Sequence, residues 1–188
     1  MSIAPAVAVS VQGAVGILQL SRPDKFNCLT MEVHRGLDAA LTRHEAPGSG
    51  VRALLIRAQG AHFCTGADLD AVQEERKTPE SLARFLARGH ATLRALETSP
   101  KPVVVAVQGL CLAGGLELML ACDVVFAANT ARFGDQHAQF GLVECAAALP
   151  VQPDAAFERG QGIVQRHLAL FHARDQRFEL VERLLELG

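Results

Sequence analysis

The segment that decides the fold covers residues 101–117 and reads KPVVVAVQGLCLAGGLE. Its continuous apolar run, Val103–Val107, is rich in β-branched residues, which is typical of a strand buried on both faces. We therefore expect this strand at the centre of a sheet. Gly109 opens a turn after it, and a compact helix is predicted from Gly114 to Cys122. A buried strand that passes through glycines into a helix indicates mixed α/β structure.

The N-terminal side of this segment contains a predicted hairpin and a predicted helix. Apolar residues alternate over 7–11 and again over 14–20, and the intervening Gln12-Gly13 is a turn signal. Thr30 is the expected N-cap of an amphipathic helix that ends before Pro47.

Strands and helices continue to alternate along the rest of the chain. A strand is predicted over 51–58, a helix begins at Thr78-Pro79, and extended segments are expected over 123–128 and 132–134. The buried face of the helix is expected to carry Leu82, Phe85, Leu86, Leu93 and Leu96. Strand-strand-helix units thus recur, which favours layered sheets.

A change in composition after Val143 suggests a domain boundary. Residues 1–143 form the predicted core, and residues 144–188 form a predicted C-terminal helical segment that begins with an Ala-rich stretch containing prolines.

Length, charge and cysteine content exclude several classes of protein. The 188 residues, 49% of them hydrophobic, suffice for one sizeable core. Eighteen Lys and Arg against 20 Asp and Glu leave a net charge of −2, so no overall positive field attracts nucleic acid or an acidic membrane. No apolar run is long enough to cross a bilayer, and the first residues lack a signal-peptide pattern. The odd number of cysteines, five, suits a reducing compartment, so we expect a cytoplasmic protein.

Two glycine-containing loops form the candidate ligand site, because each follows a predicted strand. They are residues 62–69 (HFCTGADL) and 109–117 (GLCLAGGLE). The second loop enters a helix, so the amides near Gly114 are unpaired donors at the positive end of the helix dipole. Two such N–H groups aimed at one oxygen would stabilise an enolate or tetrahedral anion by roughly 3 kcal/mol per donor. Alternatively, these glycines serve only tight turns and helix-on-sheet packing.

Several segments together resemble the enoyl-CoA hydratase/isomerase (crotonase) superfamily. The resemblance covers residues 7–143 and rests on Leu20-Ser21-Arg22-Pro23, Asn27-Cys28-Leu29, Phe63–Leu69, Lys101–Gly109, Ala113–Leu118, Ala121-Cys122-Asp123, Ala131–Gly134 and Phe140–Val143. It implies an α/β fold, the crotonase-like spiral of β-β-α units with C-terminal helices. It also implies a homotrimer or hexamer, acyl-CoA thioester substrates and a place in fatty acid metabolism.

The resemblance assigns roles to particular residues. The two amides of the family's oxyanion hole fall on Ala67 and Gly114. Hydratases of the family move protons with two glutamates, of which the first falls on Glu117, while the second position holds His137. The residues implied to contact the substrate are Lys25, Cys64, Ala67, Asp68, Leu69 and Gly114. No metal is implied, and no cofactor other than the coenzyme A of the substrate.

Two departures from the family pattern leave the reaction open. His137 could act as base or acid, or have no catalytic task. After Val143 the family's glycine-rich turn and a helical stretch that helps to close the acyl pocket are absent, so the chain resembles a shortened member. The sequence is thus compatible with a hydratase or isomerase (a hydro-lyase in the first case) that acts through a thioester enolate. It is also compatible with a crotonase-fold protein that lacks hydratase activity and only binds or assembles.

Overall fold

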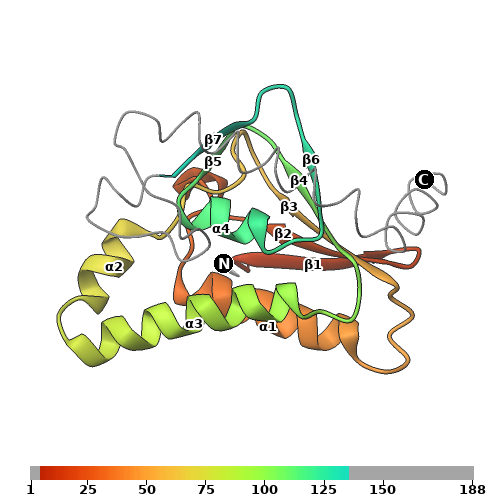
Figure 1. Cartoon of the computed structure of the whole chain (residues 1–188), viewed down its shortest axis with the longest axis horizontal. Helices are drawn as coiled ribbons and strands as arrows, with labels where there is room; N and C mark the ends of the chain where they lie inside the picture. Colours follow the sequence, from red (N-terminus) through yellow and green to blue (C-terminus); the bar gives the residue numbers. More distant parts are fainter. Residues whose placement is uncertain (1–4, 136–188) are drawn as a thin grey trace.

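The computed structural model describes residues 5–135, which form a five-stranded sheet, a smaller two-stranded sheet and the helices around them (Figure 1). The elements in chain order are β1 (Val7–Gln12), β2 (Val15–Leu20), the 3₁₀ turn η1 (Pro23–Lys25), α1 (Met31–Glu45), β3 (Ala53–Ala58), α2 (Leu69–Glu75), α3 (Pro79–Glu97), β4 (Val103–Val107), β5 (Leu110–Leu112), α4 (Gly114–Leu120), β6 (Val124–Ala127) and β7 (Arg132–Gly134). The predicted boundary at Val143, the segment 144–188 and His137 lie outside the described residues.

The main sheet has the strand order β1-β2-β3-β4-β6. The predicted hairpin of β1 and β2 is confirmed and is antiparallel, whereas the remaining neighbours pair in parallel. The strand predicted from residues 103–107 is β4, but the middle position belongs to β3. Only one face of β4 is fully buried, because Val104 and Ala106 are half-buried. The prediction that this strand is buried on both faces is therefore correct for the face that carries Val103, Val105 and Val107 and wrong for the other face.

A second layer of short parallel pairings follows the same order as the main sheet. β5 pairs with β7, and isolated bridges join Leu29 to Ala67 and Cys64 to Cys111. Each of the strands β2, β3, β4 and β6 thus leads into a short extended segment of this second layer. Helices follow the first three of these segments. This arrangement confirms the expected spiral of strand-strand-helix units.

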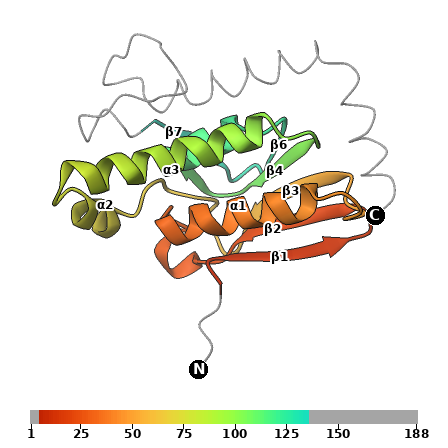
Figure 2. The ribbon, with the colours of Figure 1, turned by 90° about the horizontal axis from the view of Figure 1, so that it is seen from below.

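Helices α1 and α3 lie side by side and cover one face of the main sheet (Figure 2). Thr30 caps α1 as predicted, since its hydroxyl accepts a hydrogen bond from the Val33 amide. Thr78 likewise caps α3, ahead of Pro79. On α3, however, Leu86 is 45% exposed, because the buried stripe follows Phe85, Thr92 and Leu96 at helical spacing.

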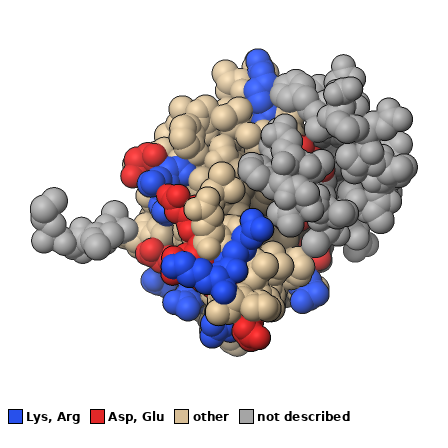
Figure 3. Space-filling model, turned by 90° about the vertical axis from the view of Figure 1, so that its left-hand side faces the viewer, with Lys and Arg blue, Asp and Glu red and all other residues tan. Residues whose placement is uncertain are grey.

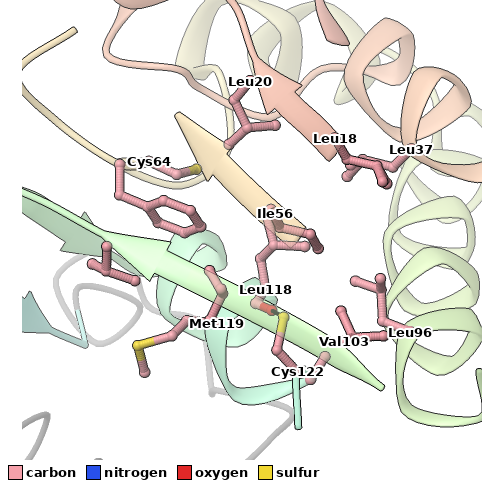
Figure 4. Close-up of a cluster of buried hydrophobic side chains, with 14 of the residues drawn as sticks. Leu18, Leu20, Leu37, Ile56, Cys64, Leu96, Val103, Leu118, Met119 and Cys122 are labelled. Carbon is pink, nitrogen blue, oxygen red and sulfur yellow. Dashed lines mark hydrogen bonds between the residues drawn. The ribbon is translucent and has the colours of Figure 1, made fainter. Parts of the chain in front are cut away.

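The core lies between this face of the sheet and the helices. Figure 4 shows strand residues such as Leu20, Ile56 and Val103 together with Leu118 and Met119 of α4, all of them buried. One strand and one α-helix were not predicted. β5 has only three residues, too few for a periodic pattern, and α2 begins inside the segment read as a loop.

Candidate active site

The two glycine-containing loops pack against each other beyond the carboxyl ends of β3 and β4. The Cys64 amide donates to the Leu110 carbonyl at 3.2 Å, and the Leu112 amide donates to the Cys64 carbonyl at 2.9 Å. A Cβ atom on Gly115 would lie 2.3 Å from the Cys64 carbonyl oxygen. Glycine at this position therefore lets α4 begin directly against the first loop.

The first candidate N–H group, on Ala67, points away from Leu29 because of the bridge between these residues. The Leu29 amide donates to the Gly66 carbonyl at 2.8 Å, and the Asp68 amide donates to the Leu29 carbonyl at 2.9 Å. The N–H of Ala67 belongs to the same trans peptide as the Gly66 carbonyl, so the two point in opposite directions. Among residues 5–135, this N–H has no acceptor.

The second candidate N–H group, on Gly114, points out of the N-terminal end of α4. The Ala113 carbonyl accepts hydrogen bonds from the amides of Leu116 and Glu117 at 2.8 and 3.1 Å, so it faces into the helix. The N–H of Gly114 lies in the same peptide plane and faces the other way. Ala113 itself has φ 47° and ψ −122°, an unfavourable conformation for a residue with a side chain. The surrounding contacts therefore hold a strained residue immediately before this amide.

The two N–H groups are close neighbours. A Cβ atom on Gly114 would lie 3.7 Å from the Ala67 nitrogen, and a Cβ atom on Gly66 would lie 3.2 Å from the Gly114 nitrogen. The Gly114 N–H also lacks an acceptor within the described part of the chain. Leu29 adds an apolar neighbour, since its Cδ1 would lie 3.1 Å from a Cβ on Gly114. The site thus combines an apolar side chain with two N–H donors that have no acceptor among residues 5–135.

Glu117 lies one helical turn after Gly114, at the position that the sequence indicated. It is half-buried, while the flanking residues Leu116 and Leu118 are fully buried. A carboxylate is therefore present on the helix that carries one of the two amides.

Comparison with known proteins identifies the family. The sequence profile of enoyl-CoA hydratase/isomerase matches residues 10–165. The chain belongs to the enoyl-CoA hydratase/isomerase family. The match continues past Val143, where the segments seen in the sequence had ended.

Individual family members agree with this assignment. Cyclohexa-1,5-dienecarbonyl-CoA hydratase of Thauera aromatica is 31% identical over 175 residues, which cover 93% of this chain and 65% of that protein. Short-chain-enoyl-CoA hydratase of Clostridium acetobutylicum is 30% identical over 136 residues, covering 72% and 51%. An enoyl-CoA hydratase structure from Polaromonas sp. JS666 superposes with a TM-score of 0.73 at 29% identity, covering 84% of this chain and 67% of that one. The fold is thus that of the crotonases, and the chain spans about half to two thirds of its relatives' length.

The residues expected to contact the substrate in this family member lie in different surroundings. Lys25 is exposed, as is Leu69 with 54% of its surface accessible. Cys64 is 0% exposed and lies in the core behind its loop. Burial raises the pKa of its thiol to about 12, so Cys64 packs as a neutral side chain. Cys111 is equally buried, so both side chains pack in the core.

The carboxylate of Asp68 is already engaged within the protein. Its Oδ1 accepts from the Ala71 amide at 3.2 Å, which caps α2, and its Oδ2 accepts from Arg22 Nη2 at 3.1 Å. Burial alone would raise the pKa of this carboxyl, but the hydrogen bonds from Ala71 and Arg22 outweigh burial and hold it below its usual value. Arg22 was not predicted as a site residue: its segment, Leu20-Ser21-Arg22-Pro23, is one of those that carry the family resemblance, but the resemblance assigned Arg22 no role.

In residues 5–135, the metal-ligating side chains, the helices and the distribution of charge on one face also limit other kinds of site. Within residues 5–135, no three His, Cys, Asp or Glu side chains are grouped so that they could hold a metal ion. In the same residues, no helix combines the length and apolar character needed for a bilayer crossing. Figure 3 shows one face of this crotonase-fold chain, on which basic and acidic side chains are interspersed rather than separated by sign.

Proposed function

We propose that this chain acts on an acyl-CoA thioester, whose carbonyl oxygen accepts hydrogen bonds from the N–H groups of Ala67 and Gly114. The observation that carries the proposal is the pair of neighbouring amides, each turned away from its own bridge or helix and each without an acceptor among residues 5–135. Such donors stabilise the negative charge that develops on a thioester oxygen, by roughly 3 kcal/mol each. Because the donors come from the backbone, the site needs no net positive charge on the protein.

The reaction that we propose is addition of water to an enoyl-CoA. The oxygen of water bonds to the β-carbon as the carbon–carbon double bond breaks, and water gives up one proton. The oxyanion hole stabilises the resulting enolate, whose α-carbon then gains one proton. Glu117, on the helix that begins at Gly114, is the proposed proton-transfer group, and His137 is the proposed second one. The Thauera and Clostridium relatives are both named as CoA-ester hydratases, which supports hydration over the other reactions of the family. A homotrimer or hexamer, a cytoplasmic location and a role in fatty acid metabolism stay predictions.

Substitution of Glu117 tests the proposal. Glu117→Gln removes the proton-transfer group and keeps the side chain's size, so hydration of crotonyl-CoA by the full chain is expected to fall by about 100-fold or more. The dissociation constant for crotonyl-CoA should stay within about threefold of wild type, because the two amides are untouched. The matched control is Glu97→Gln, at the exposed end of α3, which should leave turnover unchanged.

The outcomes separate the two functions that the sequence left open. Unchanged turnover in Glu117→Gln would refute the role of Glu117. Wild-type protein that neither hydrates crotonyl-CoA nor gains thermal stability from any CoA ester would instead indicate the non-catalytic alternative, because a ligand that binds the folded state raises its stability.

A further inference from the structure

The guanidinium group of Arg22 joins two backbone segments that are far apart in the sequence. Arg22 follows β2, and its Nη1 donates to the Cys28 carbonyl at 2.9 Å while its Nη2 donates to Asp68 Oδ2 at 3.1 Å. The side chains of Arg22 and Asp68 are 24% and 14% exposed, so solvent reaches this pair only in part. A planar guanidinium can hold two acceptors at once in fixed directions, which the single ammonium group of lysine cannot.

These two segments flank the bridge that orients the Ala67 amide. Cys28 immediately precedes Leu29, and Asp68 immediately follows Ala67. The bridge itself has only two hydrogen bonds, from Leu29 to the Gly66 carbonyl and from Asp68 to the Leu29 carbonyl. Arg22 therefore fixes both sides of a very short pairing, one residue away from it on each side.

We propose that Arg22 and Asp68 are positioning residues that set the direction of the Ala67 N–H. This inference rests on the proposed function, because it gives that direction a role in polarising the thioester carbonyl. The Arg22 guanidinium bonds to the Cys28 carbonyl and to Asp68 rather than to the Ala67 amide, so it acts through the Leu29–Ala67 bridge. Asp68 contributes by linking Arg22 to the start of α2, whose first turn it caps. If the bridge loosens, the Ala67 amide loses its alignment with Gly114, although the binding surface remains.

A second ion pair in the same chain provides a matched control. Arg88 of α3 and Asp38 of α1 are joined at 2.8 Å, with side-chain exposures of 39% and 25%, and Thr92 donates to the same carboxylate. This pair connects two helices and does not involve either loop of the site. Asp38→Asn is therefore expected to lower stability without changing the site.

The test combines a measurement without ligand and a measurement of turnover on Arg22→Lys. Without ligand, hydrogen exchange followed by NMR should show the amides of Leu29 and Asp68 exchanging about tenfold or more faster than in wild type. With crotonyl-CoA, kcat should fall by about 10- to 100-fold while KM stays within about threefold, because misplacing one donor weakens transition-state stabilisation more than binding. Asp38→Asn should show neither change.

The outcomes distinguish failure of this inference from failure of the proposed function. Unchanged exchange of these two amides in Arg22→Lys overturns the inference, whatever the activity. Faster exchange with wild-type kcat also overturns it, since the bridge would then not control the oxyanion contact. If wild-type protein hydrates no enoyl-CoA, the proposed function fails and with it the catalytic consequence, while the exchange measurement still decides whether Arg22 holds the bridge.

Discussion

Adding a single methyl group at Gly66 should lower both the stability of the fold and the activity of the amide pair. Gly66 has φ +98°, a conformation that costs an alanine about 1–2 kcal/mol. Its Cβ would lie 2.9 Å from the Ala113 Cβ and 3.2 Å from the Gly114 nitrogen, so neighbouring atoms must move. Crowding of this kind adds about 1–3 kcal/mol. Gly66→Ala is therefore expected to lose roughly 2–5 kcal/mol of unfolding free energy.

The same methyl group would also cover the Gly114 N–H. Loss of one oxyanion-hole donor lowers kcat by about 100- to 1,000-fold, and we expect a loss in this range for crotonyl-CoA hydration. The control is Gly48→Ala, because Gly48 has φ +78° but no atom within 4 Å of the added Cβ. It should show the backbone cost in a urea titration and no change in kcat.

A folded Gly66→Ala protein with wild-type kcat would refute the assignment of Gly114 as an oxyanion donor. Gly114→Ala tests the same assignment if Gly66→Ala does not fold. The nearest atom to its Cβ is the flexible Cδ1 of Leu29 at 3.1 Å, followed by the Gly66 Cα at 3.6 Å and the Ala67 nitrogen at 3.7 Å. This variant should fold and should lose kcat, since its methyl group occupies the space beside both amides.

Three further predictions concern stability and reactivity. Burial lowers the pKa of His34 below 6.5, so the unfolded chain binds protons more readily, and the free energy of unfolding should fall as the pH drops below 6.5. His34→Leu should flatten this dependence in urea titrations across that pH range, and an equal slope in the variant would contradict it. Among the four described cysteines, iodoacetamide should label Cys28 first, because the thiols of Cys64, Cys111 and Cys122 are buried and have a raised pKa. Peptide mapping by mass spectrometry gives the order of labelling, and earlier labelling of any buried cysteine would contradict the prediction. Asn27→Ala should lower the free energy of unfolding by about 2–4 kcal/mol in thermal or urea unfolding. The buried side-chain amide of Asn27 donates to the Gln59 and His62 carbonyls and accepts from the Arg22 backbone amide. A loss below about 1 kcal/mol would contradict this, because other hydrogen bonds would then replace these three.

Local signals in the sequence predicted the elements that local physics determines. Thr30 and Thr78 cap helices because their side chains bond to amides only three residues ahead. The hairpin at Gly13 depends on one residue with positive φ and on alternating apolar residues. These features need no information from distant parts of the chain.

Features that depend on distant contacts were missed or were seen only through the family resemblance. Arg22 gains its importance from Asp68, 46 residues away, and nothing in the Arg-Pro pair indicates that contact. Ala113 has a strained φ of 47° and lies against Gly66 of the first loop, and alanine is not a residue that marks such a conformation. The placement of Ala67 beside Gly114 likewise requires two turns of the spiral to stack. Family motifs pointed to these two residues, whereas their spacing in the sequence does not.

The layered pairing has a consequence for how a bound ligand changes the energetics of the chain. Each strand of the main sheet pairs only with its neighbours, in a stack that resembles a solenoid, where stability is carried largely by interfaces between adjacent repeats. Ala67 belongs to the β3 unit and Gly114 to the β4 unit. A ligand that accepts hydrogen bonds from both N–H groups would therefore add its binding free energy to one particular interface. Local separation of those two units, rather than fraying of the β1 edge, should be the opening motion that the ligand suppresses most.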